Sequence, residues 1–232
     1  MTELVFLAGA AGTVGRRLLP LLTAAGHVVF GTTRSEAKAE TIAAMGGTAV
    51  VVDVFDADAL KRAVVAAKPT VVIHQLTDLP FGLPPERMAE AAKANTRIRQ
   101  EGTRNLVAAA NAAGAGKLIA QSISWVYAPA DHPLTEADPI NPTAAGVISL
   151  EQQVLASGMI GIVLRYGRFY GPGSGVESAA EPRVHVDAAA RAALLAIGQQ
   201  QSGVFNIAEP SPGLVTAKAR DLLGWGADFR LP

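Results

Sequence analysis

Short apolar runs rich in β-branched residues alternate along the chain with longer stretches in which apolar residues recur at helical spacing. The runs predict strands at 4–8, 27–31, 48–52, 70–74, 117–121, 161–165 and 204–207. The stretches between and after them predict helices at 14–25, 35–45, 57–67, 85–113, 144–156, 187–197 and 214–223. The strands are apolar throughout, which is typical of a parallel sheet covered by helices on both faces.

This repeated β-α-β alternation, with right-handed crossovers, predicts an α/β fold with a doubly wound parallel sheet of the Rossmann type. Asp56 is placed to cap one helix and Gly114 to end another. After Tyr166 the alternation weakens, and residues 171–175 read as a loop. We therefore expect a single domain over residues 1–232, in which about 166–232 form a small C-terminal cap over the carboxyl edge of the sheet.

Composition narrows the class of protein. Half of the 232 residues are apolar and 17% are charged, which excludes a disordered chain. The 20 basic residues balance 20 acidic ones, so no net charge favours nucleic acid or an anionic membrane as a partner. There is no cysteine, no apolar run of about 18 residues, and no basic region before the first strand. These features predict a soluble, cytoplasmic protein.

A glycine-rich turn follows the first strand and opens the first helix. It reads Gly9-Ala10-Ala11-Gly12-Thr13-Val14-Gly15. Free N–H groups and the dipole at a helix N-terminus favour a pyrophosphate, which approaches closely only where no Cβ intervenes. The third glycine permits tight packing of helix on strand. The turn predicts a dinucleotide site that includes Gly9, Gly12, Thr13, Val14 and Gly15, with a plain strand-to-helix turn as the alternative.

The end of the second strand bears on which dinucleotide is bound. NAD sites usually carry an acidic residue there, which bonds the ribose 2′-hydroxyl. This chain instead has Thr33-Arg34-Ser35, and Glu36 falls inside the next helix. A guanidinium flanked by two hydroxyls suits a 2′-phosphate. We therefore expect NADP(H) rather than NAD(H), the alternative being a solvated arginine at a helix start.

Further motifs occur along nearly the whole chain in a recognisable order. They are Gly-x-x-Gly-x-x-Gly at 9–15, Gly-Thr-Arg-Asn-Leu at 102–106, Ser-Ile-Ser-Trp-Val-Tyr at 122–127, Leu-Arg-Tyr-Gly-Arg-Phe-Tyr-Gly-Pro at 164–172 and His-Val-Asp at 185–187. Together they resemble the extended and atypical short-chain dehydrogenase/reductases, the group that contains NAD-dependent epimerase/dehydratases. The resemblance implies that Asp53, Val54, Gln75 and Leu76 line the cofactor beside the glycines and Arg34. Asp53 suits either the adenine amino group or a helix cap.

The chain departs from the family at the catalytic positions. The family has Tyr-x-x-x-Lys followed by three residues and a Glu; aligned on Glu151, its Tyr and Lys correspond to Thr143 and Val147. A lysine beside the cofactor lowers the pKa of the tyrosine and makes the phenol a usable acid or base. The family's hydroxyl residue corresponds to Ile123, which lies between two serines. Two family asparagines correspond to Arg99 and Arg168, the first with Asn95 one helical turn earlier.

Remaining hydroxyl and cationic side chains supply the catalytic candidates. After the fifth strand we favour Ser124 first, then Tyr127, with Ser122 as a strand-end partner. After the sixth, Arg168 and Tyr170 are placed to contact a substrate, or else belong to the surface of the cap. The histidines His74, His132 and His185 are too scattered for a recognisable metal motif, and no metal is expected.

Two classes of function fit these features. One is an NADP(H)-dependent oxidoreductase that reduces a small carbonyl compound slowly, because the tyrosine–lysine pair is missing. The other is a dinucleotide-binding sensor or regulatory protein that kept the cofactor site and lost catalysis. A divergent epimerase/dehydratase is a further alternative. The resemblance also implies a homodimer formed through the long helix at 85–113.

Overall fold

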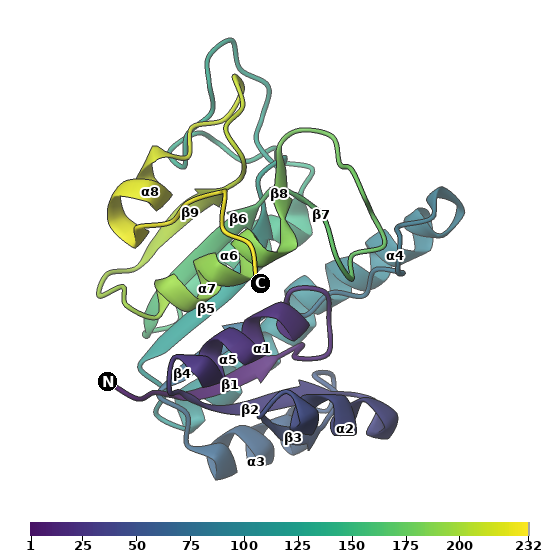
Figure 1. The fold of residues 1–232 in the computed structure, drawn as a ribbon, viewed down its shortest axis with the longest axis vertical. Coiled ribbons are helices and arrows are strands. Elements are labelled where there is room, and N and C mark those ends of the chain that lie inside the picture. Colours follow the sequence, from purple (N-terminus) through teal and green to yellow (C-terminus); the bar gives the residue numbers. More distant parts are fainter. Residues whose placement is uncertain (232) are drawn as a thin grey trace.

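A computed structural model, which describes residues 1–231, contains a seven-stranded sheet in which all neighbouring strands are parallel. Its strands are β1 Leu4–Ala8, β2 Val28–Thr33, β3 Thr48–Val51, β4 Val71–His74, β5 Lys117–Ile123, β6 Ile160–Tyr166 and β9 Gly203–Ile207. Their order in the sheet is β3-β2-β1-β4-β5-β6-β9 (Figure 1). The predicted doubly wound, Rossmann-type fold is confirmed, with its switch point between β1 and β4.

Helices cover both faces of this sheet and divide the core into two layers. The helices of one layer are α1 Gly15–Ala24, α2 Glu36–Ala44, α7 Val186–Ala196 and α8 Ala217–Leu223; those of the other are α3 Ala57–Ala67, α5 Thr103–Ala112 and α6 Ala145–Leu155. β1 contributes side chains to both layers of the core: Val5 and Leu7 pack in the first layer, and Phe6 and Ala8 pack in the second. This strict alternation explains why a strand buried on both faces reads as an unbroken apolar run.

The helix predicted at 85–113 is one continuous rod with a change of winding inside it. It consists of α4 Pro85–Arg97, a π-helical turn η1 Ile98–Gly102, and α5. The amide nitrogen of the Gln153 side chain, from α6, donates to the carbonyls of Arg99 and Gln100, which lie within the π-helical turn, at 3.4 and 3.3 Å. α4 reaches out beyond the body of the domain (Figure 1). As predicted, Asp56 caps α3, and Gly114, with φ of 73°, follows the end of α5.

The region after Tyr166 is more regular than its sequence suggests. β9 extends the main sheet beside β6, and α7 packs against α1. Two three-residue strands, β7 Arg168–Tyr170 and β8 Arg183–His185, form a separate parallel pair that was not predicted, since so short a run has no readable period. The last helix begins at Ala217 and not at the predicted Leu214, because Leu214 bridges to Leu134.

Among residues 1–231, no helix combines the length and the apolar character that a membrane crossing requires.

Candidate functional site

A cavity of about 1030 Å³ runs along the carboxyl edge of the sheet. At one end it is lined by the glycine-rich turn and the end of β2, and at the other by residues that follow β4, β5 and β6. Doubly wound folds bind ligands at this edge, where the strand order reverses. The volume lies at the upper end of the usual range for small-molecule sites, so it has room for a dinucleotide and a small second ligand.

The glycine-rich turn forms one end of the cavity. Gly9 has φ of 90°, its amide donates to Thr32 Oγ1 at 3.1 Å, and its carbonyl accepts from Gly12 N at 3.0 Å. A Cβ on Gly15 would lie 2.2 Å from the Gly9 carbonyl oxygen. Gly15 therefore sets the packing of α1 against the turn and does not line the cavity, whereas Gly9, Gly12, Thr13 and Val14 do.

The end of β2 brings its hydroxyl and cationic side chains to the cavity wall. Thr33, Arg34 and Ser35 all line it, together with Lys38 of α2, which the sequence reading did not single out. The Arg34 guanidinium is 3.2 Å from the carboxylate of Asp78, and both side chains are largely exposed. An ion pair this exposed contributes little to stability, so the guanidinium can exchange Asp78 for another anion at small cost.

The ends of β3 and β4 form the next part of the wall. Val54, Gln75 and Leu76 line the cavity as predicted, but Asp53 is not among the lining residues. The Asp53 carboxylate accepts a hydrogen bond from the amide of Phe55 at 2.9 Å. This contact closes a local turn before α3, which is capped by Asp56, so Asp53 is neither a lining residue of the cavity nor the helix cap.

His74, the last residue of β4, is fully buried beneath this wall. Its Nδ1 accepts from Leu76 N at 3.2 Å, so its Nε2 carries the proton and donates to Thr103 Oγ1 at 3.0 Å. Burial, together with the positive charge of Arg99, lowers the pKa of His74 to about 4. The imidazole is therefore neutral at pH 7 and acts as a structural link between β4 and α5.

A buried ion pair lies behind the ends of β5 and β6. Arg165 donates to Glu151 through Nε at 2.9 Å and through a terminal nitrogen at 2.7 Å, and Ser122 donates to the same carboxylate at 2.6 Å. Burial by itself would lower the pKa of Arg165, but hydrogen bonds and charge from Glu151 outweigh it and raise the pKa. Ser122 lines the cavity, with its hydroxyl turned toward the ion pair.

The other two predicted catalytic hydroxyls are placed differently. Tyr127 does not line the cavity; its hydroxyl donates to Asn206 at 2.6 Å, and its ring lies 4.8 Å from the Arg165 guanidinium carbon. Burial raises the pKa of Tyr127. Ser124 is also buried and is not a lining residue, although its neighbours in the sequence, Ile123 and Trp125, are. The Ser124 hydroxyl has no hydrogen-bond partner among the described residues.

Tyr166, which ends β6, lines the cavity and was not among the predicted site residues. Its side chain is 1% exposed, and its hydroxyl has no hydrogen-bond partner in residues 1–231. Burial raises the pKa of Tyr166 well above the ordinary value, and the nearby Gln75 side chain offsets part of this. Its position at the carboxyl end of a predicted strand was the signal that could have found it.

Of the two predicted substrate residues, only one lines the cavity in the structure. Arg168 lines the cavity; its guanidinium lies 4.7 Å from the centre of the Trp125 ring and donates to the carbonyl of Glu181 at 2.7 Å. Tyr170, from the same short strand, does not line it, and its hydroxyl donates to Glu209.

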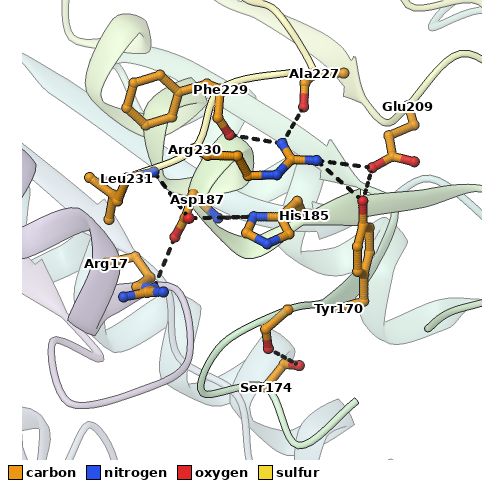
Figure 2. Close-up of polar contacts among 11 residues, drawn as sticks. Arg17, Tyr170, Ser174, His185, Asp187, Glu209, Ala227, Phe229, Arg230 and Leu231 are labelled. Atoms are coloured by element: carbon orange, nitrogen blue, oxygen red, sulfur yellow. Dashed lines mark hydrogen bonds and ion pairs between the residues drawn. The ribbon is translucent and has the colours of Figure 1, made fainter. Parts of the chain in front are cut away.

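Tyr170 belongs instead to a polar cluster that fastens the C-terminal segment (Figure 2). Arg230 approaches the Tyr170 hydroxyl at 3.4 Å. The carboxylate of Asp187, at the start of α7, lies 2.9 Å from the Arg17 guanidinium and accepts from the amide of Leu231 at 3.2 Å. The cluster therefore joins α1, α7 and the last described residues.

Comparison with known proteins places this geometry in a family. A model of the NAD dependent epimerase/dehydratase family matches residues 5–183. A 3-diazoavenalumate denitrifying reductase from a Streptomyces species is 37% identical over 240 residues, which cover 90% of this chain and 76% of that protein. An uncharacterized protein of Schizosaccharomyces pombe is 36% identical over 94 residues, or 40% of this chain and 30% of that one.

Solved structures of similar fold are more distant in sequence. The UDP-glucose 4-epimerase of Thermotoga maritima, solved with UDP-glucose, superposes with a TM-score of 0.78 and 19% identity over 97% of this chain and 94% of that one. The Bordetella bronchiseptica enzyme WbmG, solved with NAD and UDP, gives a TM-score of 0.77 and 18% identity over 100% and 91%. The matched family model, which spans the glycine turn, the switch point and the ends of β5 and β6, shows that this chain belongs to the NAD-dependent epimerase/dehydratase family.

Proposed function

We propose that the protein is an NADP(H)-dependent oxidoreductase that transfers a hydride between the nicotinamide and a small carbonyl compound. The observation that carries this proposal is the single cavity that joins the glycine turn to the ends of β5 and β6. A dinucleotide with its pyrophosphate at the turn would extend its nicotinamide toward β4, β5 and β6. The 37% identity to a protein named as a reductase supports the same class of reaction.

The preference for NADP(H) is supported by the cations at the end of β2. Arg34 and Lys38 both line the cavity, and the carboxylate that pairs with Arg34 comes from Asp78, after β4, and not from β2 itself. A 2′-phosphate accepts the same charge-assisted bidentate hydrogen bonds from a guanidinium as a carboxylate does, and it carries more negative charge. In this proposal the phosphate replaces Asp78 as the partner of Arg34.

The proposed chemistry needs a hydrogen-bond donor for the oxygen that gains charge as hydride arrives. We assign this donor to Tyr166, with Ser124 as the second candidate. Burial raises the pKa of Tyr166, so its phenol stays protonated even well above neutral pH and would donate a hydrogen bond to such an oxygen. A phenol of high pKa is a weak acid, so a slow reductase is expected.

A second candidate, a dinucleotide-binding sensor without catalysis, is favoured by the positions that align with the family's Tyr and Lys. Thr143 is exposed and its hydroxyl donates to Asn141 at 2.8 Å, while Val147 is buried within α6. Neither side chain supplies an acid to the cavity. A divergent epimerase/dehydratase stays an alternative on the same fold.

The test is a panel of activated aldehydes and ketones with NADPH, followed as loss of absorbance by the reduced cofactor. We expect slow turnover by the wild type and a decrease of about 10- to 100-fold in Tyr166→Phe, from the loss of one donor. Ser124→Ala should have a smaller effect. Tyr127→Phe is the control, because its hydroxyl is bonded to Asn206 outside the cavity. Tight NADPH binding without any turnover would favour the sensor.

Two further properties stay predictions: a cytoplasmic location and a homodimer formed through the long helix. Sedimentation analysis of the purified protein would test the second.

A further inference from the structure

The π-helical turn places a cationic side chain at the cavity wall. Arg99 lies in this turn, is partly buried and lines the cavity. Its guanidinium makes no hydrogen bond with the side chains or carbonyls of residues 1–231, and no carboxylate of these residues lies within 4 Å of it. Turns of this kind occur inside α-helices frequently at functional sites. The π-helical turn therefore places Arg99 where a ligand in the cavity can contact its guanidinium.

The charges around Arg99 do not balance. The nearest buried carboxylate, Glu151, is already held by both arms of Arg165. Burial lowers the pKa of Arg99, and the more distant charge of Glu151 offsets only part of this. The neighbouring His74 is neutral at pH 7 and supplies no charge. A partly buried cation without a counterion is unfavourable, and an anionic ligand would compensate it.

Two further residues that line the same cavity carry buried polar groups without hydrogen-bond partners. Gln75 and Tyr166 are 5% and 1% exposed, and their side chains lie beside each other, but neither the amide of Gln75 nor the hydroxyl of Tyr166 has a partner in hydrogen-bonding geometry within the described chain. Buried polar groups are nearly always hydrogen-bonded, so a bound ligand could supply the partners that the Gln75 amide and the Tyr166 hydroxyl lack. The Gln75 amide N–H₂ and the Arg99 guanidinium can both donate to a carboxylate, and the Tyr166 phenol can donate to the reacting oxygen.

The cavity also has apolar and aromatic residues in its walls. These residues are Phe81, Leu83, Met88, Trp125, Phe169 and Val176. Such walls suit a flat hydrocarbon skeleton, whereas a sugar would need more polar partners than they offer.

We propose that Arg99 and Gln75 form a subsite for the carboxylate of an aromatic or unsaturated acid, next to Tyr166, whose single O–H stays with the reacting oxygen. The proposal rests on the proposed function for the identification of that acid as the substrate. It assigns the acid group to the β4–β6 end of the cavity, away from the glycine turn. The reacting carbon would then lie on the same apolar skeleton.

The test compares the binding of 2-naphthoate with that of 2-naphthamide, its neutral analogue, by calorimetric titration with and without saturating NADP⁺. We expect the wild type to bind the carboxylate on the order of 10- to 100-fold more tightly than the amide. Arg99→Gln should abolish this preference, and Arg99→Lys should retain part of it. Circular dichroism checks that each variant is folded.

Arg97→Gln is the matched control, since Arg97 lies two residues away on the same helix but pairs with Glu101 and does not line the cavity. It should keep the full preference. Equal binding of the two probes by the wild type, or a preference that survives Arg99→Gln, would overturn the subsite while leaving cofactor binding and turnover intact. A preference that depends on Arg99 in a protein without hydride transfer would support the subsite and reject the proposed function.

Discussion

The two ends of the cavity are built from different kinds of group. Around the glycine turn the contacts come from backbone: Gly9 and Gly12 bring the chain close to a ligand, and the first turn of α1 offers its amides, while side chains are added only at the end of β2. At the β5–β6 end they come from side chains of distant segments, since Arg99, Gln75 and Tyr166 are separated by tens of residues. A substitution at a site formed by backbone can change it only by placing a new side chain in the way of the ligand. At a site formed by side chains, each substitution can remove or replace one contact with the ligand.

The same contrast holds for buried charge. The cofactor end keeps its ion pair, Arg34 with Asp78, at the surface, while the other end rests on the buried pair of Arg165 and Glu151. Family members can therefore share the first end and differ at the second, because each new substrate requires only new side chains on an unchanged backbone.

The largest effect is expected when the buried pair is broken. Glu151→Gln leaves the Arg165 guanidinium buried without a counterion, and removal of one partner of such a pair costs about 3–5 kcal/mol. The free energy of unfolding in urea should decrease by that amount. Glu101→Gln breaks the exposed pair with Arg97 and should leave the unfolding curve unchanged. Equal effects of both variants would contradict the contrast.

A smaller but still large effect is expected at the glycine turn. A Cβ on Gly12 would lie 3.2 Å from the Gly9 carbonyl oxygen, and the branches of Gly12→Val would occupy space that the pyrophosphate needs. Binding of NADPH and NADH should both weaken by at least about 100-fold, with a native circular dichroism spectrum. Gly213→Ala, whose Cβ meets nothing within 4 Å, is the control. Normal binding by Gly12→Val would make the turn structural only.

The smallest effect concerns cofactor preference. Arg34→Gln should weaken NADPH by about 10- to 100-fold and leave NADH unchanged, since only NADPH carries the 2′-phosphate. Asp78→Asn removes the competing carboxylate and should keep or strengthen the preference. Calorimetric titration of both cofactors measures it. Equal affinities of the wild type for NADPH and NADH would remove Arg34 from this role.

Most of the fold, and which residues of the glycine turn and of the end of β2 line the cavity, could be predicted from sequence because their signals are local. The apolar runs, the Asp56 cap and the glycine spacing each depend on neighbouring residues. β7 and β8 escaped prediction because they pair across a loop, and three residues have no period of their own. Tyr166 could have been found from its position at the end of a predicted strand, but its proximity to Gln75 could not, because the two residues are far apart in the chain. Tyr127 matches a family motif, yet only the fold reveals its bond to Asn206.

The π-helical turn also fixes the rotation of the long helix. Asn95, Arg99 and Thr103 follow one another at intervals of four, and in an unbroken α-helix each step would shift them by about 40° around the axis. A π-helical turn uses more residues per rotation and offsets this drift, so Asn95 can accept from the Asp78 amide while Thr103 reaches His74. Deleting one residue there would rotate Asn95 by about 100°. The hydrogen bond that Asn95 makes with the loop carrying Asp78, the partner of Arg34, therefore depends on the winding of the helix at η1.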